Sequence, residues 1–215
     1  EGICIAFYAR KDLRKLEKFM ENKPVAEQDI GRQLLQETAA YAESSVCRRK
    51  MLLHYFGEEY NVENCHNCDN CLHPTEKFEA KDALVVVLQA VAAVKENFRQ
   101  EYIIDFVKGR GTDDIVSHKH DQLEEFGAGE DMDAKVWNPV IRQALIAGYL
   151  KKDVENYGLL KLTAAGKRYL KAPKSFMIVA DKEFKDDYVE RSHRGSTNVE
   201  ALDPALFAML KDLRK

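Results

Sequence analysis

The sequence predicts a mostly α-helical protein with small β elements: a helical hairpin carrying a four-cysteine site, then a second helical unit. Three observations predict this fold class. Four cysteines share the spacing Cys-x17-Cys-x2-Cys-x2-Cys, several helical patterns run into a tight β-hairpin, and one strand–helix pair opens the chain. With 215 residues, 45% of them hydrophobic, two small packed domains are expected.

The opening run, residues 2–8, is continuously apolar, which is the pattern of a buried parallel strand. Cys4 lies in this run and is expected to be a small buried hydrophobic side chain. Asp12 can cap a helix that extends to Asn22. A strand followed by a helix is typical of the last unit of an α/β domain. We therefore expect residues 1–22 to end such a domain and the chain to be a piece of a longer protein.

Residues 23–79 are predicted to form a helical metal-binding module. Two helical patterns lie between Val25 and Phe56, and Gly57 is a suitable stop for the second. A polar loop then leads to the run Cys65-His-Asn-Cys68-Asp-Asn-Cys71, while Cys47 lies at the start of the second helix. The two helices and the loop can thus enclose one ion.

The cysteine spacing predicts a structural zinc site. A Cys-x2-Cys turn directs two sulfurs to one point about 2.3 Å from zinc, and four thiolates complete a tetrahedral shell with no open position. Cys47, Cys65, Cys68 and Cys71 supply that shell. The alternatives are incidental free cysteines, or replacement of one thiol by His66 or His73. A closed shell indicates an architectural role and not a catalytic one.

Residues 80–174 are predicted to form the second unit. Helices are expected at Ala83–Val94, Glu101–Lys108, Asp114–Phe126 and Ala134–Ala147, with a loop at 127–133. Strands Tyr149–Asp153 and Leu159–Leu162 then form a hairpin, and Thr163 caps a last helix to Lys171. This order is that of a winged helix, a helix-turn-helix variant with an added β-ribbon. Residues 175–203 are predicted as a linker, and Asp203-Pro204 starts a final helix over 204–215.

The uneven distribution of charge along the chain indicates the kind of partner to expect. Residues 80–134 hold 6 basic and 12 acidic side chains, whereas residues 135–172 hold 8 basic and 2 acidic ones. A phosphate backbone responds to such a local basic surface and not to the net charge of −3. No apolar stretch approaches the ~18 residues of a membrane span. A zinc–thiolate cluster favours a reducing compartment.

The cysteine motif in its context carries a family resemblance. The stretch from Tyr41 through Cys47-Arg-Arg-Lys to Gly57, followed by Cys65-x2-Cys68-Asp-Asn-Cys71, resembles the zinc-binding module of RecQ-family DNA helicases. Residues 102–109, Phe126-Gly-Ala-Gly129 and the segment from Trp137 to Gln143 are similar to the winged-helix (RQC) part of that family. Residues 205–215 resemble the first helix of its helicase-and-RNase-D C-terminal (HRDC) module.

The resemblance implies a parent enzyme that hydrolyses ATP with Mg2+ and unwinds duplex DNA in the 3′ to 5′ direction, in DNA repair and recombination. Residues 1–22 would then be the end of the second RecA-like motor domain. No Gly-x4-Gly-Lys-Ser/Thr phosphate loop is present, so we expect this chain alone to lack ATPase activity. Implied partners are duplex or forked DNA and a single-stranded DNA-binding protein, in the bacterial cytoplasm at the nucleoid or in a eukaryotic nucleus.

Three residues of the hairpin are candidates for DNA contact. Tyr157 lies between Asn156 and Gly158 at the wing tip, where its ring could stack on a terminal base pair and hold strands apart. The alternative is a tyrosine folded back on the wing. Lys151 and Lys152 are candidates for phosphate contact, and strand alternation sends one to each face, so we expect only one to touch DNA.

A second candidate set precedes the predicted third helix. Thr112 can cap that helix and leave amide donors for a phosphate, with Arg110 and Lys119 nearby. Asp113 and Asp114 would repel the same phosphate. Trp137 and Arg142 are expected to serve packing and local hydrogen bonding.

Two other classes of protein fit the same elements. One is a zinc-containing winged-helix transcription regulator that reads bases, although its helices would expose few bidentate readers. The other is a protein-interaction module whose acidic half suits a basic partner.

Overall fold

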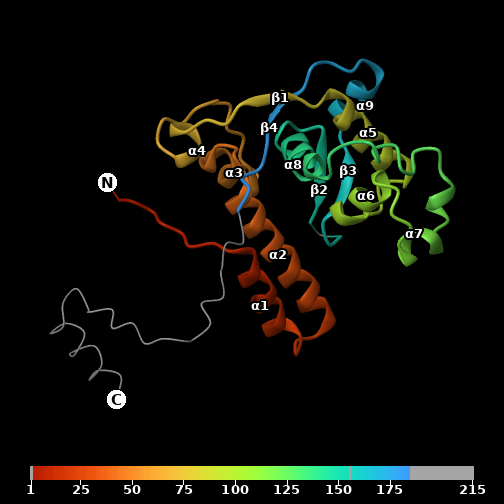
Figure 1. The fold of residues 1–215 in the computed structure, drawn as a ribbon, viewed down its shortest axis with the longest axis horizontal. Coiled ribbons are helices and arrows are strands. Elements are labelled where there is room, and N and C mark those ends of the chain that lie inside the picture. Colours follow the sequence, from red (N-terminus) through yellow and green to blue (C-terminus); the bar gives the residue numbers. More distant parts are fainter. Residues whose placement is uncertain (1, 155, 185–215) are drawn as a thin grey trace, which may run out of the picture. The chain divides into compact units, whose positions relative to one another are not determined.

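The computed structural model describes residues 2–154 and 156–184, which form helices with four short strands (Figure 1). The first part of the chain is helical: α1 Arg10–Met20, α2 Val25–Glu43, α3 Arg48–Tyr55 and α4 Asp69–Leu72. The second part contains β1 Lys77–Glu79, α5 Lys81–Ala93, α6 Gln100–Val107, α7 Asp113–Ser117, α8 Trp137–Ile146, β2 Leu150–Asp153, β3 Leu159–Leu162, α9 Ala164–Lys171 and β4 Met177–Val179. The mostly helical fold class is confirmed.

The opening of the chain differs from its prediction. Residues 2–9 form no strand, and Cys4 is exposed. A strand needs a neighbour to satisfy its backbone groups, and no described strand pairs with this run. Helix α1 is capped by Ala9 without a side-chain hydrogen bond, so Asp12 lies in the first turn and not at the cap. Assignment of residues 1–22 to a RecA-like domain stays a prediction.

Helices α1 to α3 have almost no apolar core. α1 packs against α2, and α2 against α3 (Figure 1). Cys47 is the one buried apolar side chain among the described side chains of residues 2–72, whereas Phe19, Ile30 and Leu34 are exposed. The two helices predicted between Val25 and Phe56 are confirmed as α2 and α3, and so is the stop at Gly57, whose φ is +79°. This part of the protein therefore needs something other than apolar burial to hold its shape.

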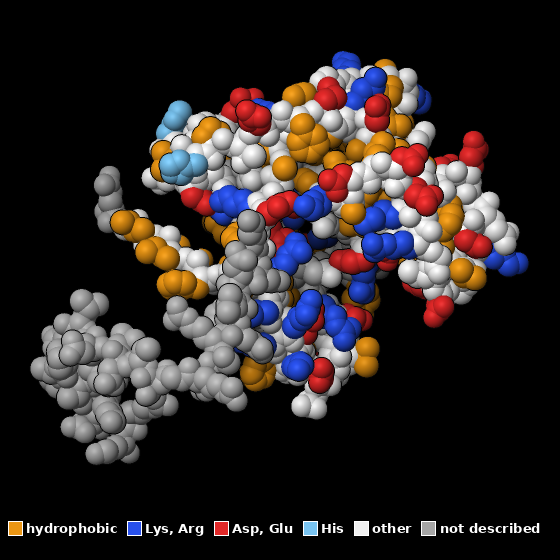
Figure 2. All heavy atoms as spheres, viewed as in Figure 1, with side chains coloured by type: hydrophobic (Ala, Val, Ile, Leu, Met, Phe, Trp, Pro, Cys, Tyr) orange, Lys and Arg blue, Asp and Glu red, His pale blue; other side chains and the backbone are white. Residues whose placement is uncertain are grey.

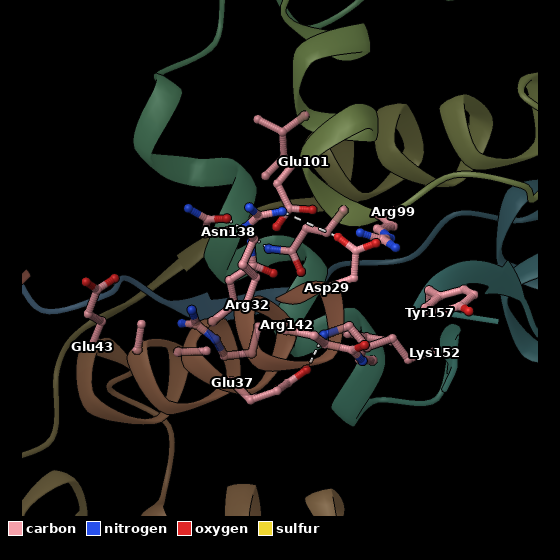
Figure 3. A pocket seen from close by; sticks show the side chains of 18 of the residues that line it. Asp29, Arg32, Glu37, Glu43, Arg99, Glu101, Asn138, Arg142, Lys152 and Tyr157 are labelled. Carbon is pink, nitrogen blue, oxygen red and sulfur yellow. Dashed lines mark hydrogen bonds and ion pairs between the residues drawn. The ribbon is translucent and has the colours of Figure 1, made fainter. Parts of the chain in front are cut away.

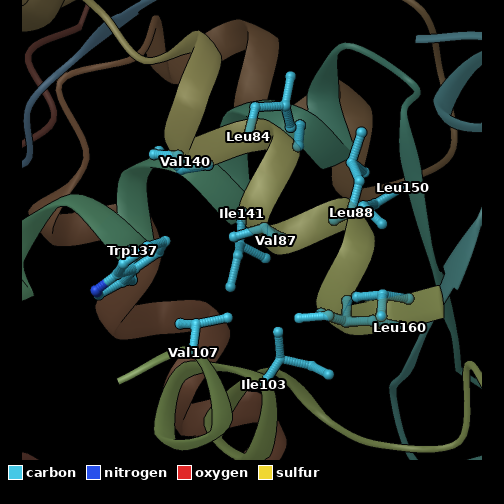
Figure 4. Packing of buried hydrophobic residues seen from close by; sticks show 14 of the residues in the cluster. Leu84, Val87, Leu88, Ile103, Val107, Trp137, Val140, Ile141, Leu150 and Leu160 are labelled. Atoms are coloured by element: carbon cyan, nitrogen blue, oxygen red, sulfur yellow. The ribbon is translucent and has the colours of Figure 1, made fainter. Parts of the chain in front are cut away.

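The hydrophobic core belongs to the second part. Helices α5, α6 and α8 pack together and against the hairpin (Figure 4). The largest side chains with no exposed surface include Trp137, Phe106, Leu84 and Ile141. Trp137 lies against Gly129, where a Cβ atom would stand 2.3 Å from the indole ring. The three-helix core with its appended hairpin is the winged helix that the sequence predicts.

The predicted third helix of the winged helix is much shorter than expected. α7 ends at Ser117, and Lys119 has a left-handed φ of +58° before a single 3-10 turn at His120–Gln122. Side chains of Ser117 and His118 bond to the carbonyl of Asp114 and compete with helix continuation. The segment to residue 133 consists of turns that Gly127 and Gly129 anchor to the α6 carbonyls of Phe106 and Val107. The prediction of one helix over 114–126 was wrong.

Two further strands were not predicted. β1 and β4 pair antiparallel with Phe78 opposite Ile178, whose exposed fraction is 1%. β4 lies in the range 175–203 that was predicted as a linker, so the beginning of that range is part of the fold. The remainder of the predicted linker and the predicted helix over 204–215 lie outside the described residues. Within the part of the chain that the structure describes, no helix is both long and apolar enough to cross a membrane.

The hairpin has a register that sorts its side chains onto two faces. Lys151 stands opposite Lys161, and Lys152 opposite Leu160. Leu160 is fully buried and Leu150 nearly so, which identifies the face with Leu160 and Lys152 as the inner one. Lys151 and Lys161 are therefore neighbours on the outer face.

Candidate metal centre and nucleic-acid interface

The four predicted zinc ligands come together. Cys47 lies at the start of α3, Cys65 and Cys68 lie in the loop before α4, and Cys71 lies within α4. Their sulfur atoms are all within 4.8 Å of one another. A tetrahedral zinc–thiolate site has sulfur–sulfur separations of about 3.8 Å. The four sulfurs therefore fit a closed zinc site after small rotations of their side chains.

The backbone around the cluster stabilises negative sulfur. The amide of Cys68 donates to Sγ of Cys65 at 3.4 Å, and the amide of Cys65 donates to Sγ of Cys71 at 3.4 Å. The Cys68 amide lowers the pKa of Cys65 to about 6, whereas burial raises the pKa of Cys71 to about 12. Thiolates so close together repel one another, and a bound dication offsets this repulsion and deprotonates its thiol ligands. The chemistry of the donor set thus fits zinc.

Polar side chains next to the cysteines join the metal-binding loop to α2. Arg48 forms a bidentate pair with Asp69, at 3.0 and 3.1 Å, and also donates to the carbonyls of Tyr41 and Ala42. Asn70 donates to the carbonyls of Ser44 and Val46 at 2.8 and 2.6 Å. Arg48 therefore serves contacts within the protein.

The chain segment after β4 ties the two parts of the protein together. Asp181 pairs with Arg142 of α8, and Lys182 pairs with Asp69 at 2.8 Å. The amide of Lys182 also donates to the carbonyl of Glu43 at 2.7 Å. These contacts link α8 of the winged helix to α2 and to the cysteine loop.

The wing shows which predicted DNA contacts are free. Lys152 forms an ion pair with Glu37 of α2, whereas Lys151 forms no ion pair within the described residues. Lys161 stands beside Lys151 and also lacks an ion pair there. Both lysines lower the pKa of nearby Asp153, after a larger effect of its hydrogen bond with Asn156. Two lysines directly opposite each other repel, and Asp153 is a single nearby carboxylate for both, so the outer face of the wing presents two lysines without an ion pair in the described residues.

Tyr157 occupies the wing tip with an unusual backbone. Its φ of +57° is left-handed, and 49% of its surface is exposed. The guanidinium of Arg99 lies 5.7 Å from the ring centroid, close enough for a cation–π interaction. The residue is thus about half exposed and its ring lies beside Arg99, and stacking of the ring on a base pair stays a prediction.

The second candidate set does not join the wing. Thr112 caps α7 by accepting from the amide of Ile115 at 3.4 Å, as predicted. Arg110 pairs with Asp105 at 3.1 Å, and Lys119 is exposed. Within the described residues, no hydrogen bond or ion pair joins these three residues to the wing. Exposed acids predominate around α7, at the right of Figure 2.

The side chains of helix α8 that could read bases are engaged in contacts within the protein; α8 precedes the wing in the chain. Asn138 accepts from Gln100 at 2.9 Å, and Gln143 donates to the carbonyl of Val179 at 2.8 Å. Arg142 is held by Asp181, and 12% of its side chain is exposed. Trp137 is buried, as expected. Direct base readout by this helix would require these contacts to break.

Sequence reasoning missed Asp69, Asn70, Lys161 and Glu37. Asp69 and Asn70 stand between two ligand cysteines, and an acid there beside an arginine after Cys47 was a usable signal. Lys161 could have been found from the hairpin register, which places it opposite Lys151. Glu37 lies 115 residues from Lys152, and no local pattern predicts such a contact.

The fold and the site define a class of protein in which a four-cysteine cluster that fits zinc lies beside a winged helix, and comparison with known proteins identifies the family. The chain matches the RecQ zinc-binding family over residues 10–72 and the RQC domain family over residues 74–187. It is 30% identical over 214 residues to the ATP-dependent DNA helicase RecQ of Pasteurella multocida and to that of Haemophilus influenzae. Each alignment covers 99% of this chain, and 33% or 34% of the relative. The ATP-dependent helicase SGS1 of Saccharomyces cerevisiae is 30% identical over 60% of this chain.

The chain belongs to the RecQ family and carries its zinc-binding and RQC parts. It spans about a third of the length of the two bacterial relatives. The predicted family resemblance is confirmed.

Proposed function

We propose that this chain is the zinc-stabilised DNA-binding platform of a RecQ-like, ATP-dependent 3′ to 5′ DNA helicase that acts in DNA repair and recombination. The names of the bacterial relatives and the family matches support a helicase parent. ATP and Mg2+ would act in motor domains of that parent. The 215 residues contain no phosphate loop, so the chain by itself should not hydrolyse ATP. The parent would work at the bacterial nucleoid in the cytoplasm or in a eukaryotic nucleus.

Zinc has a structural role in this proposal, with Cys47, Cys65, Cys68 and Cys71 as its ligands. The donor set and the mutual distances of the sulfurs support it. Helices α1 to α3 lack an apolar core, so another source of folding free energy is needed. Structural zinc supplies on the order of 10 kcal/mol of folding free energy. When bound, zinc would fix α3 and the loop at 65–71 relative to α2.

The outer face of the wing is the proposed contact with duplex DNA. The single observation that carries it is the juxtaposition of Lys151 and Lys161 without an ion-pair partner in the described residues. A phosphate placed between them would relieve their repulsion. Lys152, on the inner face, is paired with Glu37 and does not itself touch the DNA in this proposal.

Strand separation is proposed for Tyr157. Its ring is exposed at the tip of the hairpin, and its strained backbone conformation is of the kind found at functional sites. Stacking of such a ring on a base is worth about 1–3 kcal/mol. A forked end, where the last base pair is already weakened, would be the preferred substrate, and a single-stranded DNA-binding protein is a fitting partner for the separated strand.

A base-reading transcription regulator is less well supported. Asn138, Arg142 and Gln143 are engaged within the protein, so contact with phosphate and not with bases is favoured. The acidic surface around α7 and the pairing of Arg110 with Asp105 also make a broad duplex grip weak. We therefore propose modest affinity that does not depend on sequence.

Separate substitutions of Lys151 and Lys152 test the proposal. Lys151→Ala should reduce the slope of log affinity against log salt by about 0.9, the value expected for one lost phosphate contact. Lys152→Ala removes the same charge from the inner face and is the matched control for the slope, which should stay near the wild-type value even where loss of the pair with Glu37 lowers the affinity itself. Equal slopes for Lys151→Ala and the wild type would refute the outer-face contact.

A further inference from the structure

A cleft of about 510 Å³ separates the wing from the long helix of the zinc module (Figure 3). α2 forms one wall, and the wing, the start of α6 and one side of α8 form the others. Acidic residues lining the cleft outnumber the basic ones. The excess is a single residue, because Lys152 and three arginines also line the walls, so the charge of the lining is nearly balanced.

One ion pair crosses this cleft. Lys152 of β2 meets Glu37 of α2, with 24% and 29% of their side chains exposed (Figure 3). Lys152 extends from the inner face of the hairpin, opposite the fully buried Leu160. Its ammonium can therefore reach α2 while the outer face of the wing remains free.

The wing tip also approaches α2. A Cβ atom on Gly158 would lie 3.0 Å from Nε2 of Gln33, one helical turn before Glu37. In β3, the amide of Leu160 donates to the carbonyl of Phe98 at 2.9 Å. The hairpin is thus held through β3 by the α5–α6 connection and along its inner face by α2.

The structure assigns Glu37 the role of a positioning residue for the wing. Through Lys152 it fixes the orientation in which Lys151, Lys161 and Tyr157 are presented to DNA. This inference rests on the proposed DNA-binding function. Because α2 is also joined to the cysteine loop through Arg48 and Asn70, one helix connects the metal centre to the DNA-binding wing.

The variant Glu37→Gln keeps the shape of the side chain and removes its charge. We expect amide hydrogen exchange in residues 150–162 to become faster, and affinity for a duplex with a forked end to fall about two- to fivefold, as for the loss of a partly exposed ion pair. The matched control is Glu27→Gln, which removes the same charge from an exposed position in the first turn of α2. It should leave both measurements unchanged.

The double variant Glu37→Lys with Lys152→Glu separates positioning from direct contact. The exchanged charges can pair again, so wing protection and DNA affinity should return to within about twofold of the wild type. Failure of this rescue, or tighter DNA binding by Glu37→Gln, would overturn the assignment. If the wild-type chain binds no duplex DNA at all, the proposed function fails, and hydrogen exchange of the wing alone decides whether Glu37 holds it.

Discussion

Removal of zinc should unfold helices α1 to α4, while the winged helix stays folded. Helices α1 to α4 have 11, 19, 8 and 4 residues, about half of the helical residues in the described ranges. Cys47 is the one buried apolar side chain described in residues 2–72. Loss of on the order of 10 kcal/mol of metal-binding free energy exceeds what so little apolar burial can replace. The winged helix keeps its own core around Trp137.

The experiment has two signals that separate the two parts. Chelation of zinc, or Cys71→Ser, should lower the helical circular dichroism by about a third to a half. The emission of Trp137, the single tryptophan and fully buried in the winged helix, should not shift. Cys4→Ser is the control, because Cys4 is exposed and outside the cluster. A helical signal that survives chelation, or a red shift of Trp137 in step with helix loss, would refute the reasoning.

Three further predictions concern single side chains. Burial alone would raise the pKa of Glu43, but hydrogen bonds from Arg10 and Tyr8 lower it. Because Glu43→Gln weakens these hydrogen bonds, it should lower the free energy of unfolding by about 1 kcal/mol. Since a lowered carboxyl pKa contributes stability above its unfolded value of about 4.3, that cost should be constant from pH 8 to 6 and shrink only below about pH 4 in denaturant titrations. Gly129→Ala drives a methyl group into Trp137 and should cost about 1–3 kcal/mol or more, seen as a lower melting temperature, and an unchanged one would contradict the packing. Tyr157→Ala should leave the duplex affinity of the chain nearly unchanged but slow unwinding by the parent enzyme, and unimpaired unwinding would remove the ring from the mechanism.

The parts of the fold that local patterns determine were predicted well. The cysteine spacing located the metal cluster, and glycines and apolar periodicity located α2, α3, α5, α6, α8 and the hairpin. Thr163 caps α9 as predicted, with its hydroxyl accepting from the amide of Gly166 at 3.0 Å.

The failures have a common physical cause, which is dependence on distant partners. The apolar run at 2–8 has strand character, but the described structure offers it no neighbouring strand. β1 and β4 are three residues each and are stable only as a pair separated by about a hundred residues of sequence. Lys152 was a sound candidate for phosphate contact until its register placed it on the inner face beside Glu37.

The salt dependence of duplex binding by the wild-type chain tests the central claim most directly. Two or three phosphate contacts on the wing predict a slope of about −2 to −3 in log affinity against log salt, equal for two duplexes of unrelated sequence. Absence of duplex binding at low salt, or a strong preference for one of the two sequences, would contradict a sequence-independent DNA platform.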